Sequence, residues 1–197
     1  MTPAVLLTRK VREATPSLLA CGGLGVAVAA RVALGGSEVA ASMPAAAVFA
    51  CLLFLAAGVV RWRPSLPQWR GIGVGVAGAA VLVGFALQAR DWHVIGPSEA
   101  ALSLAAWSVV VVCVAVAEEI VLRGVIFASL SRSGGPISAL LLTSILFALI
   151  HLPLYGVGAL PLDFAVGLWL GGLRLLGGVG ASATAHALTD LATGWIL

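Results

Sequence analysis

The chain has 197 residues, of which 61% are hydrophobic and only 10% are formally charged. Soluble domains carry about 25% charged residues, so this composition excludes an ordinary soluble globule because too few charges remain to cover a surface in water. The mean hydropathy of +1.12 agrees. We therefore expect an integral membrane protein, in which about seven spans of roughly 20 residues leave only short loops.

Seven apolar stretches follow one another along the chain, and each predicts a helix. They run from Ser17 to Leu34, Met43 to Val60, Gly71 to Ala89, Ala100 to Ala117, Pro136 to Leu152, Leu162 to Leu176 and Ala181 to Leu197. Strands are not expected, because an open sheet edge cannot face lipid and the stretches lack the alternation of a barrel. The predicted fold class is all-α, a polytopic transmembrane helical bundle of about seven spans. Residues 1–98 would contribute three of its helices and residues 99–197 about four.

Basic residues are distributed unevenly between the expected loops. With a cytoplasmic N-terminus, nine of the eleven Lys and Arg residues fall on the cytoplasmic side, whereas Arg31 and Arg90 fall on the other. Cytoplasmic loops carry such an excess, so we expect the N-terminus inside, and we assign the net charge of +3 to topology rather than to a nucleic-acid partner. A cleaved signal peptide ending near Ala29 is the alternative for the first stretch, but its apolar run continues to Leu34 and favours an anchor.

Glycines gather in the third stretch, at Gly71, Gly73, Gly75 and Gly78. Small residues permit close contact between helices in lipid, and we expect that role here. Residues 73–78 also match the GxGxxG pattern, but a dinucleotide site needs a preceding strand, so we reject that interpretation. The three cysteines are isolated within apolar runs and predict neither a disulfide nor a thiolate metal site.

Six ionisable residues lie within or beside the apolar stretches in the second half of the chain. They are Glu118, Glu119, Arg123, His151, His186 and Asp190. Ionisable side chains inside membrane spans are costly and mark functional sites by default. Each of these residues also has a simpler interpretation when it is taken alone. The two glutamates would then be solvated groups at the cytoplasmic boundary, and each histidine would be a structural hydrogen-bond donor whose bond is satisfied. Two histidines and an acidic pair in otherwise apolar helices favour one shared site instead.

The residue types restrict the chemistry of that site. Arg123 follows Glu119 by four residues, the favourable spacing for a helical ion pair, which leaves Glu118 available. A glutamate and an imidazole can take a proton from water, and a second imidazole can donate to a developing oxyanion. Asp190, four residues after His186, can fix the tautomer of that ring. We therefore expect hydrolysis, although neither HExxH nor GxSxG is present.

Three short patterns in the right order carry a family resemblance. Residues 118–123, Glu-Glu-Ile-Val-Leu-Arg, resemble the EExxxR motif of the CAAX-protease and bacteriocin-processing (CPBP, or Abi) intramembrane proteases. Residues 147–151 resemble the FxxxH motif of that family, and residues 186–190 resemble its HxxxN/D motif. The resemblance extends over about residues 100–197 and implies that residues 99–197 form a catalytic core.

The same resemblance implies roles for individual residues. Glu118 with His151 would activate the water, while His186 and Asp190 would stabilise the oxyanion; Asp190 stands where many members carry Asn. Alternatively, Glu118, His151 and His186 could bind a catalytic zinc, with Asp190 orienting His186. We favour a glutamate protease without a metal cofactor, because the HExxH spacing that presets two zinc ligands on one helix is missing.

The expected function is that of an intramembrane endopeptidase acting on membrane-proximal protein or peptide segments, with membrane lipid around it. The Arg-rich, Lys-poor composition suggests the cytoplasmic membrane of a bacterium, and we expect water to enter from the cytoplasmic side. The alternative is a proton-coupled transporter or a catalytically silent partner protein, since Glu, His and Asp also form proton relays in membranes. Recognisable inverted repeats would favour transport, and we find none.

The expected spans leave a mismatch in depth between the first two motifs. Glu118 lies about 27 Å along a helix from Ala100 at ~1.5 Å per residue, near the cytoplasmic face, whereas His151 lies about 22 Å from that face. Straight parallel helices would keep them apart. A long fourth helix reaching Leu130, or a fifth span that begins outside the bilayer core, would bring them together.

The charge distribution predicts the location of two reporters. A reporter fused after Leu197 should be extracytoplasmic and one inserted at Ser65 should be cytoplasmic, because most basic residues lie on the side of the N-terminus. Alkaline phosphatase and green fluorescent protein fusions distinguish the two compartments. A cytoplasmic reporter after Leu197 would contradict the seven-span arrangement.

Overall fold

The computed structural model describes residues 3–63, 69–88 and 104–196. These residues are almost entirely helical, and no strand occurs among them, which confirms the all-α class. The helices are α1 (Pro3–Gly35), α2 (Met43–Val59), α3 (Trp69–Gln88), α4 (Leu104–Glu119), α5 (Phe127–Tyr155) and α6 (Leu160–Ile196), with the 3-10 turns η1 (Gly36–Glu38) and η3 (Val157–Ala159) and the π-helical segment η2 (Ile120–Ile126).

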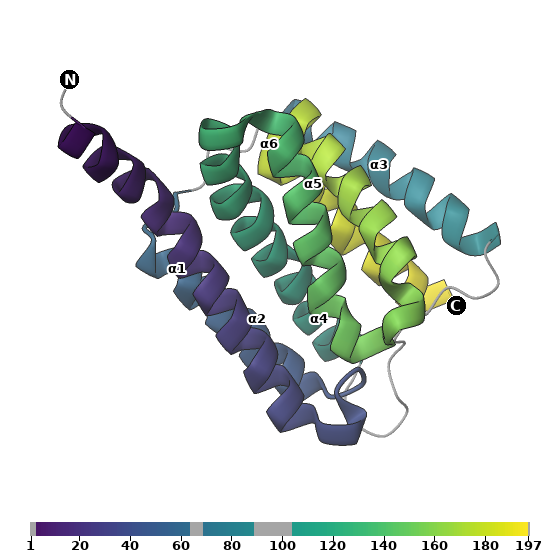
Figure 1. Cartoon of the computed structure of the whole chain (residues 1–197). Helices are drawn as coiled ribbons and strands as arrows, with labels where there is room; N and C mark the ends of the chain where they lie inside the picture. Colours follow the sequence, from purple (N-terminus) through teal and green to yellow (C-terminus); the bar gives the residue numbers. More distant parts are fainter. Residues whose placement is uncertain (1–2, 64–68, 89–103, 197) are drawn as a thin grey trace.

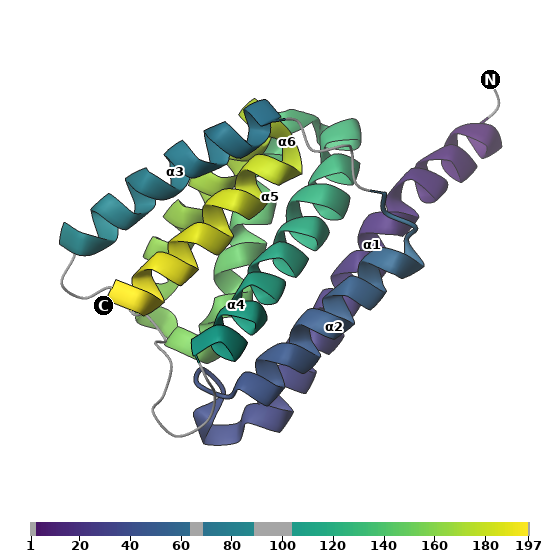
Figure 2. The ribbon, with the colours of Figure 1, turned by 180° about the vertical axis from the view of Figure 1, so that it is seen from behind.

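Two glycines divide the last two long helices. Gly135 in α5 has φ 83° and Gly178 in α6 has φ 76°, a backbone conformation that glycine adopts at little cost. The chain turns at both points, so α5 and α6 each consist of two helical segments (Figures 1 and 2). Residues 136–155, 160–177 and 179–196 thus correspond to the last three predicted stretches.

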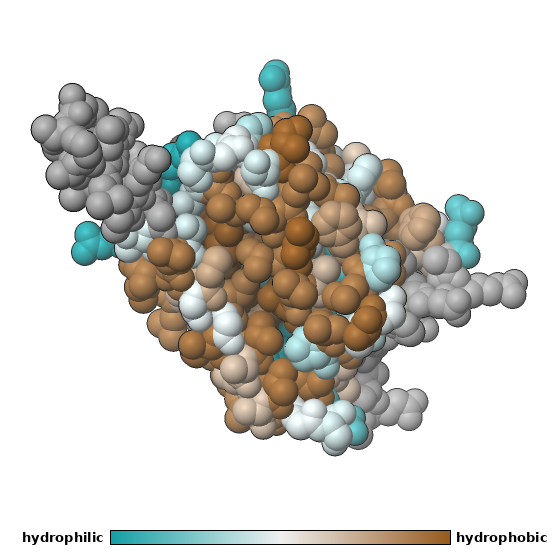
Figure 3. Space-filling model, in the orientation of Figure 1, coloured by the Kyte–Doolittle hydropathy of each residue, from teal (hydrophilic) through white to brown (hydrophobic). Residues whose placement is uncertain are grey.

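The outer surface is apolar. Three helical stretches in the described part of the chain are long and apolar enough to cross a membrane, Thr15–Glu38, Arg70–Gln88 and Val157–Trp195, while Met43–Val59 is apolar but shorter. Leu18 is 70% exposed and Leu176 is 77% exposed. Figure 3 shows a face covered mostly by hydrophobic residues, with strongly hydrophilic ones protruding at its edges. Such a surface requires lipid, whereas the number of crossings and the side of the N-terminus stay predictions.

The helix that carries the first motif is longer than the sequence predicts. The predicted fourth stretch ends at Ala117, but α4 continues through η2 into α5 and remains helical up to Gly135. The predicted end of this helix at Ala117 is therefore wrong, whereas the helical spacing expected of Glu119 and Arg123 is present. The first of the two arrangements that resolve the depth mismatch, a long fourth helix, is the one observed. The π-helical turns follow Glu119 directly, and such turns frequently occur at functional sites.

Small residues bring α3 against α6, which lie side by side (Figure 2). A Cβ atom on Gly71 or Gly75 would collide with a backbone carbonyl oxygen of α6, at 2.6 Å for Gly75. A Cβ atom on Gly78 would collide with the side chain of Leu173. Gly73 has open space around it, so the predicted role in close contact is confirmed for three of these four glycines.

The first two helices complete the wall around the site. α1 packs against α2, and α2 packs against α4. Phe49 and Leu53 of α2 are buried in the same apolar core as Val121 of η2 and Leu170 of α6. The first predicted stretch is therefore an integral part of the bundle, and its last turns reach the residues of the predicted site. The division into residues 1–98 and 99–197 stays a prediction.

Candidate active site

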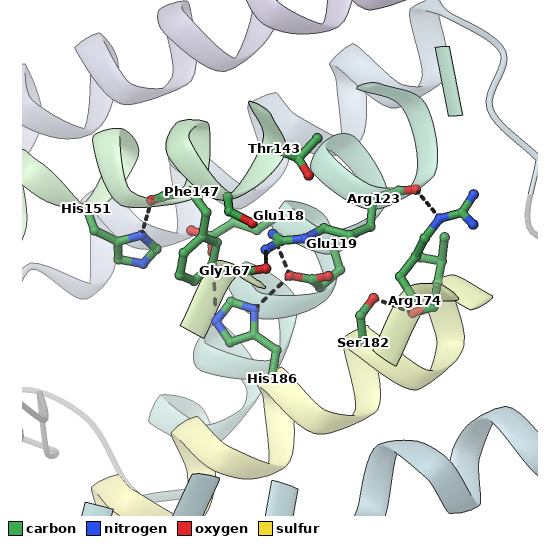
Figure 4. A network of polar contacts seen from close by, with 12 residues as sticks. Glu118, Glu119, Arg123, Thr143, Phe147, His151, Gly167, Arg174, Ser182 and His186 are labelled. Carbon is green, nitrogen blue, oxygen red and sulfur yellow. Dashed lines mark hydrogen bonds and ion pairs between the residues drawn. The ribbon is translucent and has the colours of Figure 1, made fainter. Parts of the chain in front are cut away.

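The centre of the site is a fully buried ion pair within one helix. Nη1 of Arg123 donates to Oε1 of Glu119 at 2.9 Å, and both side chains are 0% exposed. Nη2 of Arg123 donates to the backbone carbonyl of Gly167 at 3.1 Å. The guanidinium carbon also lies 4.8 Å from the centre of the Phe147 ring. The predicted pairing of Glu119 with Arg123 is thus present, with additional contacts from α5 and α6 (Figure 4).

His186 joins this pair from α6. Its Nδ1 lies 3.3 Å from the Glu119 oxygen that also accepts from Arg123. Its Nε2 faces two further carboxylates, with Asp190 Oδ2 at 3.5 Å and Glu118 Oε2 at 3.9 Å. An N–H on either ring nitrogen therefore has a carboxylate acceptor nearby. Asp190 contacts His186 as its i+4 spacing predicts, which is suited to orienting the ring.

Glu118 has a different environment from its neighbour Glu119. Its side chain is 2% exposed and lines a cavity, and one of its carboxylate oxygens, Oε2, has no hydrogen-bond partner among the described residues. The boundary interpretation, in which both carboxylates are solvated, is therefore wrong. A buried carboxylate oxygen that accepts no hydrogen bond is destabilising, so binding of a hydrogen-bond donor beside it is favourable. In a cavity of about 140 Å³, a water molecule or a substrate can provide one.

His151 lies in the same cavity but makes no ion pair with the acidic cluster. Its Nδ1 faces the carbonyl oxygen of Phe147 at 2.8 Å, so the proton belongs on Nδ1 and Nε2 is left to accept. Its ring lies 4.4 Å from that of Phe147 and stacks on Tyr155 at 5.7 Å. Phe147 in turn contacts the ring of His186 at 5.4 Å. The two motif histidines are therefore brought together around one aromatic ring (Figure 4).

The cavity lies toward one end of the bundle. Its lining includes Arg31 in the last turns of α1, Met43 at the start of α2, Trp107 near the start of α4 and Tyr155 at the end of α5. With a cytoplasmic N-terminus, this end of the bundle is the extracytoplasmic one. Two of our expectations therefore conflict for this cavity. If the N-terminus is cytoplasmic, water cannot enter this end of the bundle from the cytoplasmic side.

The residues considered for zinc do not form a metal site as they are placed. Within the described ranges, no three His, Cys, Asp or Glu side chains are grouped closely enough to bind a metal ion. His151 is oriented by its own helix backbone, and His186 is oriented by Glu119 and Asp190. Glu118, His151 and His186 share a cavity without converging on a single point.

Two lining residues were missed by the sequence analysis. Arg31 was counted among the charges on the extracytoplasmic side at the end of the first stretch, but it lies in α1 and is only 7% exposed. Trp107 is 2% exposed and packs against Gly194. A charge inside a membrane helix was the available signal for Arg31. The signal was overlooked because Arg31 stands within four residues of the end of the stretch.

One comparison with known proteins gives a match. Residues 100–192 match the sequence model of a family described as type II CAAX prenyl endopeptidase, Rce1-like. This range covers just under half of the chain and includes all three motifs, which confirms the resemblance they carry. No curated protein and no solved structure matches the chain.

The buried ion pair predicts a large loss of stability on removal of its cation. Arg123→Ala should lower the free energy of unfolding by about 3–5 kcal/mol, because it leaves Glu119 buried without its cation. Thermal unfolding in detergent measures the effect. Arg132→Ala, at an exposed position on the same helical segment, is the control and should unfold like the wild type. Equal melting temperatures for the two variants would contradict the assignment.

Proposed function

We propose that the chain is an intramembrane endopeptidase that hydrolyses peptide bonds with water activated by Glu118, on the premise that residues 100–192 match the Rce1-like family of type II CAAX prenyl endopeptidases. The single observation that carries this proposal is the contrast between adjacent glutamates. Glu119 is paired with Arg123 and is not among the residues that line the cavity, whereas Glu118 lines the cavity and has no Arg or Lys within ion-pair distance among the described residues. Only one of the two carboxylates is therefore free to act on a bound water.

The proposed reaction adds water to the carbonyl carbon of the peptide. Glu118 takes a proton from the water, and the water oxygen forms the new bond to carbon. An N–H of His186 donates to the carbonyl oxygen as it becomes negative. When the C–N bond breaks, the leaving amine receives the proton carried by Glu118, which restores the carboxylate. Nε2 of His151 can accept the second hydrogen bond of the attacking water.

Asp190 is proposed as a positioning residue. Its Oδ2 lies 3.5 Å from Nε2 of His186, and its side chain is 38% exposed. A carboxylate at this distance orients the ring and favours a proton on Nε2. When substrate binds, this N–H would turn from Asp190 to the carbonyl oxygen on which negative charge develops. In this role Asp190 only accepts a hydrogen bond. An aspartate can therefore fill it, although an aspartate cannot donate to the oxyanion as an asparagine could.

The proposed substrate is a membrane-proximal segment of a protein or peptide. An active site enclosed by lipid-facing helices favours substrates that are already in the membrane or held against it. The proposed location is the cytoplasmic membrane of a bacterium, as the Arg-rich composition suggests. We also propose that the reaction is independent of zinc, because Glu118 and the two histidines are oriented by other contacts and do not converge.

The proposal predicts that Glu118→Gln abolishes hydrolysis while the protein remains folded. Gln keeps the shape of the side chain but cannot take a proton from water. The readout is a comparison of protein N-termini in membranes of cells with the wild type and with the variant, in which product fragments should disappear. Glu38→Gln, on the exposed turn η1, is the matched control and should retain the fragments.

Two results would contradict this assignment. The first is a normal set of fragments from folded Glu118→Gln protein. The second is loss of hydrolysis by the purified wild type on treatment with a strong chelator and its recovery with zinc, which would contradict the metal-independent mechanism. Activity unchanged by chelation would support that mechanism.

A further inference from the structure

Arg31 is a buried cation that forms no ion pair with the residues that the structure describes. It belongs to α1, outside the range that matches the family, and is 7% exposed. Its guanidinium carbon lies 5.1 Å from the centre of the Phe49 ring, its Nε has no hydrogen-bond partner, and no carboxylate in the described part of the chain forms an ion pair with it. A buried charge without an ion-pair partner lowers the stability of the folded protein. Binding of an anion beside Arg31 would offset this cost.

A second donor without a partner lines the same cavity. Nε1 of Trp107, in α4, is buried and makes no hydrogen bond with the residues that the structure describes. Arg31 and Trp107 line the cavity together with Glu118 and His186. The cavity therefore has unused hydrogen-bond donors on two helices, as well as the proposed base.

We propose that Arg31 and Trp107 form an anion-binding subsite that takes a carboxylate of the peptide substrate. This assignment rests on the proposed function, because it places the subsite in the cavity of the proposed base. The guanidinium would form charge-assisted hydrogen bonds with the carboxylate, and the indole N–H would donate a further one. The carboxylate can be the C-terminal one of a peptide or that of an acidic side chain.

The chemistry of the cavity favours a substrate group over a permanent ion. Beside its polar residues, the lining has an apolar part that includes Leu82, Val111, Val114 and Leu162. An apolar peptide with one negative group matches such a lining, because its side chains bury against the wall while the charge meets Arg31. Binding of that group would fix which peptide bond lies beside Glu118.

The test measures binding to full-length Glu118→Gln protein in neutral detergent, so that hydrolysis does not interfere. Three pools of apolar tetrapeptides are the probes: one with free C-termini, one with C-terminal amides, and one with amides and a single Glu. At least one acidic pool should bind about tenfold or more tightly than the neutral amides, as expected for charge-assisted hydrogen bonds shielded from water. Which acidic pool binds better identifies the source of the carboxylate.

Variants then assign the preference to the proposed donors. Arg31→Met should abolish it and raise the melting temperature, because it removes a buried charge without a partner. Trp107→Phe should weaken it, since the ring stays and the N–H is lost. Arg132→Met, at an exposed position, is the control and should leave the preference unchanged.

Several outcomes would overturn the subsite. The first is equal binding of all three pools, and the second is a preference for an acidic pool that survives Arg31→Met. The third is a lower melting temperature of the Arg31→Met protein that is reproduced by Asp91→Asn or by Glu99→Gln, because such a result would indicate that Arg31 has an ion-pair partner within the chain. Arg31-dependent binding of phosphatidylglycerol alone would also overturn it. Arg31-dependent peptide binding without hydrolysis by the wild type would support the subsite and contradict the proposed function instead.

Discussion

The buried ion pair between Glu119 and Arg123 is the constraint on which the rest of the site depends. Two charges in the interior of an apolar bundle are costly, and their pairing together with further hydrogen bonds offsets that cost. The pair recruits the carbonyl of Gly167 from the first half of α6 and the imidazole of His186 from the second half. A local i+4 pair thereby fixes how the two segments of α6 pack against η2, and with them the position of His186.

The same pair explains why adjacent glutamates differ. Successive residues of a helix point about 100° apart, so Glu118 turns toward the cavity while Glu119 turns toward Arg123. The π-helical turns that begin at Ile120 place Arg123 beneath Phe147, against which His151 and His186 also pack. Glu118 therefore lies next to both histidines without an ion-pairing cation of its own.

Much of this arrangement could be predicted from the sequence, because it depends on local spacing. The i+4 spacings predicted the contacts of Glu119 with Arg123 and of His186 with Asp190. Hydropathy misplaced the end of the fourth helix, because charged residues that are buried by packing against other helices lower the local hydropathy as much as charged residues in a loop do. Arg31 was missed because it stands close to the end of its apolar stretch, where a charge is expected to be solvated.

The account is tested most directly by the contrast between Glu119→Gln and Glu118→Gln, with unfolding and peptide hydrolysis measured on the same preparations. The account predicts that Glu119→Gln lowers the melting temperature markedly, because Arg123 loses its counterion, whereas Glu118→Gln keeps the melting temperature and loses hydrolysis. A stable Glu119→Gln protein that is inactive, beside an active Glu118→Gln protein, would contradict it.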